Sequence, residues 1–426
     1  MDTSKYNTIK GTFLEPLKNA YSKIVQKRKC CAFSDWQFLV SGIARVLHKC
    51  ESGREWIQSS TAIPELRSSV TISAFFAALR SKRRLKVIEQ TAENLKDLAE
   101  ESAGSHDPHA QHPELDEFAI YATDGHFHGA SAHDDIIEDK KRAICHIFCL
   151  NLRSHIMSLL TSCIPNDENK RKHEMKALKE LPFRALRMGQ AIGKKVIHVY
   201  DKAIIDYRQW FKWKHAMGVY IITCEKEKSA LEVVGEPPYD RDDPRNAGII
   251  ANQYVASKDG AMLRRVTYEN PDDGKEYKFL TNELSLPPGL IAFLYRMRWD
   301  IEKVYDETKS KLGENKCWAK TSEAKKQQAH LICMTHNLMI MLEREIEKAT
   351  GIVDTKSIKK QKKRKMEQLK QAREAGRTPN TLVIKNKRLT QRSLQFIRWL
   401  RSEFINMTSW ESSITRLRPL MKKYLS

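Results

Sequence analysis

Four side chains that could bind or act on a ligand recur at helical spacing, three, four and seven residues apart. They lie in the segment LIAFLYRMRWDIEKVYDETKSKL (290–312). At about 100° per residue they fall within a wedge of roughly 60°, beside an apolar face. These four residues are Tyr295, Arg298, Glu302 and Lys309. One interpretation is an ordinary amphipathic helix in which Arg298 and Glu302 form an i,i+4 ion pair worth about 0.2–0.5 kcal/mol. The other is a helix that presents a polar stripe to a ligand.

Two aspartates end apolar segments that have the character of buried strands, FAIYATD (118–124) and KVIHVYD (195–201). A carboxylate at the end of such a strand lies at the edge of the sheet, where ligands bind in α/β proteins. Asp124 and Asp201 are therefore candidate functional acids, although an aspartate after a strand also commonly begins a turn. Asp206, five residues after Asp201, is an alternative for the second acid.

The order of the expected elements indicates an α/β protein. Strands are expected at 118–124, 143–152, 155–160 and 195–201, and long helices at 288–312 and 322–348. We expect three regions: a helical N-terminal region (1–105), a central α/β domain (115–320) containing a β-rich stretch (216–282), and a helical, basic C-terminal region (321–426).

Composition narrows the class of protein. The 426 residues include 74 Lys plus Arg against 53 Asp plus Glu, a net charge of +21, and 41% hydrophobic residues, enough for a sizeable core. No apolar run reaches the 18 or so residues of a membrane span. The segment MDTSKYNTIK lacks the apolar core of a secretion signal. The nine Cys are scattered along the chain, which suits a reducing cytosol. We therefore expect a soluble intracellular protein that binds a polyanion.

Two segments concentrate the positive charge. Residues 80–86 contain five basic side chains, and residues 356–373 contain nine with a single acid, Glu367. Either segment could contact a DNA backbone, while the first could equally be the solvated face of a helix.

The spacing Y-(2)-R-(3)-E-(6)-K, from Tyr295 to Lys309, resembles the signature of the YREK subgroup of DDE transposases from bacterial insertion sequences. The tryptophan after the arginine, Trp299, resembles that group as well, and so do LTN (280–282), the Asp124-Gly125 pair and Asp201. The resemblance covers about residues 118–315, and the two ends of the chain are covered only loosely.

The resemblance implies a ribonuclease-H-like catalytic domain with a D, D, E triad, here Asp124, Asp201 and Glu302, and with the β-rich stretch as an insertion. The triad would bind two Mg²⁺ (or Mn²⁺) ions, which activate a water or 3′-hydroxyl nucleophile and stabilise the leaving oxygen.

By the same resemblance, Tyr295, Arg298 and Lys309 would contact DNA phosphates. Trp299 could stack on a base or pack into the core. Strand alternation places His126 and His128 on the same face as Asp124, where they would bind DNA or pack.

We therefore expect a DNA transposase that binds the inverted-repeat ends of its element as a homodimer, cuts double-stranded DNA there and joins the 3′ ends to target DNA. It would act in the bacterial cytoplasm, associated with the nucleoid. The alternatives are a ribonuclease-H-like nuclease without strand transfer, a domesticated DNA-binding protein derived from a transposase, and a basic ribosomal or RNA-binding structural protein.

Overall fold

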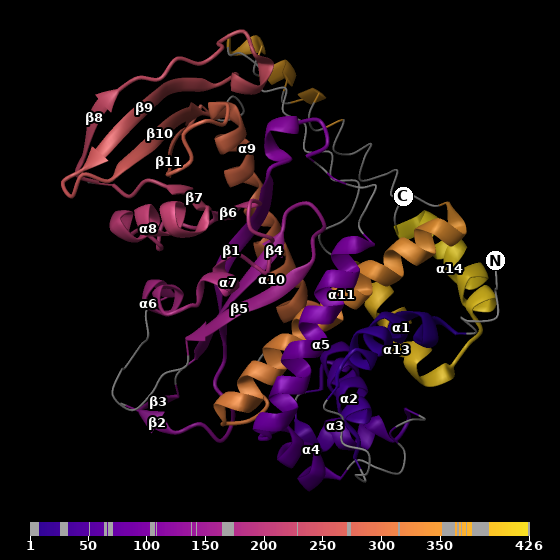
Figure 1. The fold of residues 1–426 in the computed structure, drawn as a ribbon. Coiled ribbons are helices and arrows are strands. Elements are labelled where there is room, and N and C mark those ends of the chain that lie inside the picture. The colour runs from indigo at the N-terminus through magenta and orange to yellow at the C-terminus, as the bar shows by residue number, and fades with distance from the viewer. Residues whose placement is uncertain are drawn as a thin grey trace.

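The computed structural model describes residues 8–25, 33–50, 52–63, 66, 71–102, 107, 109–137, 139–141, 143–163, 174–227, 229–270, 274–313, 316–351, parts of 363–376, and 392–424. A large sheet flanked by helices forms one side of the molecule, and the N- and C-terminal helices gather on the other (Figure 1). Within these ranges, none of the helices has the length and hydrophobicity needed to cross a lipid bilayer.

The central sheet has nine strands in the order β5-β4-β1-β6-β7-β11-β10-β9-β8. They are β1 (Phe118–His128), β4 (Ile144–Asn151), β5 (Met157–Cys163), β6 (Lys195–Val199), β7 (Val219–Cys224), β8 (Leu231–Gly235), β9 (Ile249–Ser257), β10 (Met262–Glu269) and β11 (Glu276–Thr281), with β2 (Ile136–Ile137) and β3 (Lys140–Lys141) forming a separate ladder. The pairs β1–β6 and β6–β7 are parallel, and every other adjacent pair is antiparallel. The α/β class is thus confirmed, and the arrangement is consistent with a ribonuclease-H-like domain.

The four strands expected from apolar runs are confirmed as β1, β4, β5 and β6. The stretch expected to be β-rich contains β7 to β11. Its first strand, β7, pairs in parallel with β6 and belongs to the parallel centre of the sheet, whereas β8 to β11 extend the same sheet beyond β7. The β-rich stretch therefore continues the central sheet.

Helices cover both faces of the sheet, because successive residues of its central strands are apolar and point to opposite faces. On β1, Ile120 packs in a core with α9 (Pro288–Met297) and α10 (Trp299–Lys311). The next residue, Tyr121, packs on the opposite face with the side that carries α6 (Glu174–Lys179), α7 (Phe183–Leu186) and α8 (Tyr207–Met217).

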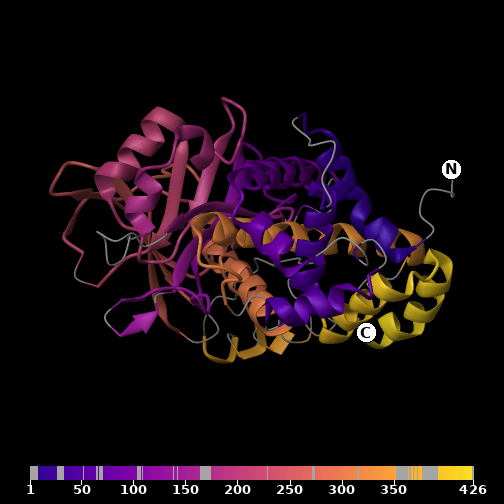
Figure 2. The same ribbon diagram turned by 90° about the horizontal axis from the view of Figure 1, so that it is seen from below.

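The remaining helices pack around a single hydrophobic cluster built from both ends of the chain. They are α1 (Ile9–Ser22), α2 (Asp35–His48), α3 (Gly53–Ser60), α4 (Ile72–Leu79), α5 (Lys82–Glu101), α11 (Ser322–Thr350), α13 (Leu394–Asn406) and α14 (Trp410–Tyr424). Figure 2 shows the indigo N-terminal helices against the orange α11 and the yellow C-terminal helices. The cluster includes Phe13 from α1 and Phe404 from α13, whose ring centroids are 5.5 Å apart.

The long helix α11 joins this helical body to the sheet. The amide of Asn337 accepts from the Met157 N–H at 2.8 Å and donates to the Met157 carbonyl at 2.9 Å. The side chain therefore supplies the hydrogen bonds that a neighbouring strand would give to this end of the edge strand β5.

The β-rich extension is held against α9 at Gly289. The Gly289 N–H donates to Asn246 Oδ1 at 2.9 Å, within the short 3₁₀ helix η4 (Pro244–Asn246). A Cβ at position 289 would lie 1.8 Å from the Arg245 carbonyl oxygen, so this contact requires a glycine. A second 3₁₀ helix, η3 (Pro113–Leu115), precedes β1.

Candidate active site

Asp124 lies on β1, on the face that packs against α10. Its Oδ1 accepts the Gly125 N–H at 2.9 Å, and the hydroxyl of Tyr305 on α10 donates to its carbonyl oxygen at 2.8 Å. Its side chain is 20% exposed. β1 and α10 therefore meet directly at this residue.

Asp201 follows β6, the parallel neighbour of β1. Its Oδ1 accepts the Ala203 N–H at 2.8 Å, and its carbonyl oxygen accepts from Thr223 on β7 at 2.6 Å. The loop that carries Asp201 is thus fixed from both sides.

The alternative acid, Asp206, is the N-cap of α8. Its carboxylate accepts the Gln209 N–H at 2.9 Å and pairs with Lys179. Burial raises its pKa, but these contacts outweigh burial and the pKa is lowered overall. Asp206 therefore caps a helix, as its residue type favours.

The helix expected at 288–312 is divided at Arg298, where α9 ends and α10 begins. The Arg298 N–H donates to the Tyr295 carbonyl, and the Ile301 N–H donates to the Arg298 carbonyl. Both bonds span three residues, so the backbone tightens here into a 3₁₀-like turn.

The guanidinium of Arg298 joins two of the expected acids. Nη2 lies 2.7 Å from Glu302 Oε1, and Nη1 lies 3.5 Å from Asp124 Oδ2. The Arg298 side chain is only 8% exposed, so water screens these charges weakly. Burial lowers the pKa of Arg298, but the attraction of Tyr295, Glu302 and Asp124 outweighs burial and raises it overall.

Asp124 has the most perturbed carboxyl group of the site. Burial raises its pKa to about 7, Arg298 opposes this shift, and the negative charges of Asp201 and Glu302 add to it. Asp124 therefore interacts electrostatically with each of the other two acids. A carboxyl group whose pKa is raised by burial and by neighbouring acids is a candidate functional group.

The other residues expected from the spacing lie along the same helices. Tyr295 is half-buried, with its ring 4.9 Å from that of Phe279, and burial followed by the neighbouring Cys224 raises its pKa. Trp299 is 56% exposed, which excludes the core packing that the sequence left open. Lys309 is exposed on α10.

The donor set suits a hard divalent cation, because three carboxylates offer only oxygen ligands. Among the described residues, no three His, Cys, Asp or Glu side chains are close enough to hold a metal ion. The charges of Asp201 and Glu302 both raise the pKa of Asp124, so each of these acids lies near Asp124. The chemistry of the three carboxylates is therefore compatible with such a cation, whereas their positions in this structure do not form a metal site among the described residues.

Sequence reasoning missed Tyr305, which supports Asp124 from α10. The ring of Tyr305 stacks on His126 at 4.3 Å, and His126 and His128 contact each other at 5.1 Å. Both histidines are buried and pack behind the site. Packing was one of the two roles expected for them from the sequence. The position of Tyr305, three residues after Glu302, was the available signal.

The basic segment 80–86 is partly structural. Arg83 donates two hydrogen bonds to Asp35, at 2.8 and 2.6 Å. Arg84 donates to the Phe33 carbonyl, while Lys82 and Lys86 are exposed. The segment 356–373 lies mostly outside the described residues.

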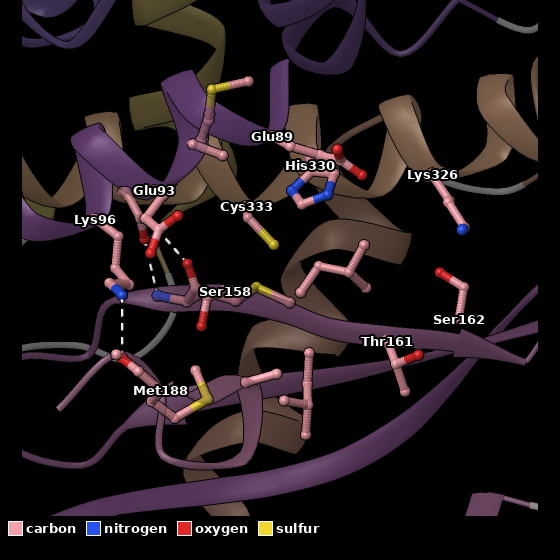
Figure 3. A pocket seen from close by; sticks show the side chains of 18 of the residues that line it. Glu89, Glu93, Lys96, Ser158, Thr161, Ser162, Met188, Lys326, His330 and Cys333 are labelled. Carbon is pink, nitrogen blue, oxygen red and sulfur yellow. Dashed lines mark hydrogen bonds between the residues drawn. The ribbon is translucent and has the colours of Figure 1, made fainter. Parts of the chain in front are cut away.

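A separate cavity of about 740 Å³ lies between α5, β5 and α11 (Figure 3). Its lining contains acidic and basic side chains, among them Glu89, Glu93, Lys96 and Lys326, and Lys96 donates to the Met188 carbonyl at 3.2 Å. The lining includes none of the site residues expected from the sequence.

The fold and the acidic site are consistent with enzymes that transfer phosphoryl groups with divalent metal ions. Residues 101–338, more than half of the chain, match the family model described as the transposase DDE domain. The chain belongs to this family. A search of curated proteins finds no match.

Proposed function

We propose that this protein is a transposase of the YREK subgroup, which cuts DNA at the ends of its element and joins the 3′ ends to target DNA. The observation that carries the proposal is the electrostatic interaction of Asp124 with Asp201, Glu302 and Arg298, which come from β1, the end of β6 and the α9–α10 junction. Family membership supports it.

In this proposal Asp124, Asp201 and Glu302 hold two Mg²⁺ or Mn²⁺ ions, which when bound activate the nucleophile and stabilise the leaving oxygen of an in-line displacement. The contribution of the chain is to hold the three carboxylates on rigid elements. Asp124 must be ionised to act as a ligand, and its pKa near 7 makes this the step most sensitive to pH.

The remaining signature residues would bind DNA. Arg298 would contact a phosphate from its position between Asp124 and Glu302, Lys309 would contact one as a point charge, and Tyr295 would donate its hydroxyl. The exposure of Trp299 supports stacking on an unpaired base.

The partners would be the inverted-repeat ends and the target DNA, bound by a homodimer. Residues 115–320 would form the catalytic domain, while the helical regions 1–105 and 321–426, with their basic segments, would read the end sequence. We propose the cytoplasm of a bacterium, and association with its nucleoid, as the site of action.

The test is Glu302→Gln, assayed on DNA from both sides of the reading frame, where the proposed function places the ends of the element. This variant should bind end DNA as the native protein does and should lose Mg²⁺-dependent cleavage. The matched control is Glu232→Gln, at an exposed glutamate on β8, which should cleave normally. Undiminished cleavage by Glu302→Gln would remove the triad from the proposal.

The same assay separates the alternative functions. Joined products, as opposed to nicks alone, would exclude a nuclease without strand transfer. Tight binding of end DNA with no cleavage by the native protein, in either Mg²⁺ or Mn²⁺, would indicate a domesticated DNA-binding protein.

A further inference from the structure

Helix α10 carries two buried carboxylates on the side turned away from Glu302. Asp300 and Glu307 are seven residues apart and so lie about 20° apart around the helix axis. Glu302 lies about 160° from the first and about 140° from the second. The side chains of Asp300 and Glu307 are 5% and 0% exposed.

Three residues from distant parts of the chain connect these two carboxylates. His155 Nε2 lies 3.5 Å from Asp300 Oδ2, and the His155 carbonyl accepts from His336 Nε2 at 3.0 Å. His336 Nδ1 lies 3.3 Å from Arg392 Nη1, which donates to Glu307 Oε1 at 2.7 Å. We call these five residues, whose contacts run as a chain from Asp300 to Glu307, the α10 clamp.

The proton positions in the clamp follow from its acceptors. A carbonyl oxygen can only accept, so His336 carries its proton on Nε2, and its Nδ1 accepts from Arg392. Burial and the charge of Arg392 hold the pKa of His336 well below its ordinary value, so this ring is neutral. The two side-chain contacts of His336 thus have defined directions.

Arg392 is the central member of the clamp. Its backbone N–H also donates to Glu307, its Nε lies 3.2 Å from Glu343, and Lys311 on α10 donates to its carbonyl at 2.7 Å. Its side chain is 2% exposed. Arg392 precedes α13, and therefore ties α10 to the C-terminal helices.

His155 has a backbone conformation that indicates a specific role. It lies in the turn between β4 and β5 with a φ of 59°, in the left-handed region that residues with a Cβ seldom adopt. Such strain persists where the surrounding structure requires it, often near functional sites. Here the turn brings the imidazole and the carbonyl of one residue to two successive members of the clamp.

A buried ion pair is a weak source of stability, because desolvation of the charges offsets most of their attraction. Its geometry, however, is specific. Two contacts two turns apart on one side of α10 fix both its rotation about its axis and its position along it. The contact from Tyr305 to Asp124 fixes the same helix to β1.

We propose that His155, His336 and Arg392 are positioning residues, which hold α10 so that the Glu302 carboxylate faces Asp124. The proposal rests on the proposed function, because it concerns the site that Glu302 completes. Residues that orient metal ligands from behind change metal affinity or activity by about 10–100-fold when they are removed.

The decisive variant replaces both charges, Arg392→Met with Glu307→Met, because removing Arg392 alone would leave the buried Glu307 carboxylate uncompensated. We expect the fold to be retained by circular dichroism and Mn²⁺ binding, measured by electron paramagnetic resonance, to weaken about tenfold or more. The cleavage rate at saturating end DNA should fall by a similar factor, with a change in KM of less than about twofold. Native Mn²⁺ affinity and rate in the folded double variant would overturn the proposal.

Arg392→Lys is a second, milder variant, which keeps the charge but loses the fork. It should weaken Mn²⁺ binding about threefold to tenfold. If the double variant does not fold, native Mn²⁺ affinity in Arg392→Lys would overturn the proposal.

The matched control is Arg83→Met with Asp35→Met, which removes another guanidinium–carboxylate pair that does not touch α10. It should leave Mn²⁺ affinity unchanged, and an equal loss in this control would overturn a specific role for the clamp. Glu302→Gln separates the two proposals. If that variant binds Mn²⁺ as the native protein does, the proposed function fails; if it loses binding while the clamp variants keep it, only the clamp fails.

Discussion

Arg298 and Glu302 form an ion pair across the junction of α9 and α10, with 2.7 Å between Nη2 and Oε1. The same guanidinium lies 3.5 Å from Asp124 on β1. One cation therefore compensates two acids that are distant in the sequence. The i,i+4 pair that an ordinary amphipathic helix would contain is present, and its arginine also reaches a third element.

Arg298→Lys should reduce cleavage roughly tenfold or more at saturating DNA, because an ammonium group lacks the planar fork that faces two carboxylates at once. Arg298→Gln should have a larger effect, since it also removes the charge. Single-turnover cleavage in Mg²⁺ measures both variants. Arg296→Lys is the matched control at an exposed neighbouring position and should be near native. Equal rates in Arg298→Lys and native protein would contradict this role of the guanidinium.

Asp124→Asn should stabilise the protein at pH 8 while abolishing cleavage. The pKa of Asp124 is raised to about 7, so the folded state binds its proton more tightly than the unfolded state does. Stability is therefore lost as the pH rises from about 4 through 7, and the asparagine variant escapes this loss. We expect its advantage in the free energy of unfolding to grow by roughly 1–3 kcal/mol between pH 5 and pH 8.

Urea unfolding at the two pH values measures this difference. Asp242→Asn, at an exposed aspartate, is the control and should show no pH-dependent gain. A gain for Asp124→Asn that is equal at both pH values would show that Asp124 ionises normally in the folded protein.

Gly289→Ala should lower the free energy of unfolding by roughly 2–4 kcal/mol, because the new methyl group would overlap the Arg245 carbonyl and push η4 away from α9. Gly235→Ala is the control: its Cβ would meet only Tyr254 at 3.7 Å, an ordinary contact. Thermal unfolding of the two variants compares them directly. Similar unfolding midpoints for the two variants would mean that η4 can move away from α9 without a loss of stability.

Substitutions in the segment 80–86 should distinguish the basic side chains that bind DNA from those that stabilise the fold. Lys82→Gln with Lys86→Gln should leave stability unchanged and weaken binding of end DNA, reducing the salt slope of the affinity by about two. Arg83→Gln should instead destabilise the fold, because Asp35 loses both hydrogen bonds. Filter binding at several salt concentrations and thermal unfolding measure these effects. An unchanged salt slope in the lysine variant would exclude this face from the DNA contact.

Much of the sheet could be predicted from the sequence, because its central strands are buried on both faces and read as continuous apolar runs. Asp124 and Asp201 were then identifiable as the polar residues that end two of these runs. The sequence did not predict that β7 belongs to the parallel centre of the sheet, since a strand there and a strand in the β-rich extension have the same local pattern.

The support of the site could not be predicted, because it depends on contacts between distant segments. Nothing local to Arg392 indicates that it lies against Glu307, 85 residues away. The division at Arg298 was hidden as well, because residues 290–312 are compatible with one continuous helix. The exposure of Trp299 depends on what the neighbouring elements leave uncovered.

The contact between Gly289 and Arg245 has a consequence for how such a protein can evolve or be re-engineered. The strands β8 to β11 belong to the same sheet as β7. The 3₁₀ helix η4, which lies between β8 and β9, contacts the first turn of α9. If β8 to β11 alone were exchanged between homologous proteins, the Arg245 carbonyl would be separated from Gly289, which accommodates it. Residues 225–290 should therefore be inherited, or transplanted into a chimera, as one block.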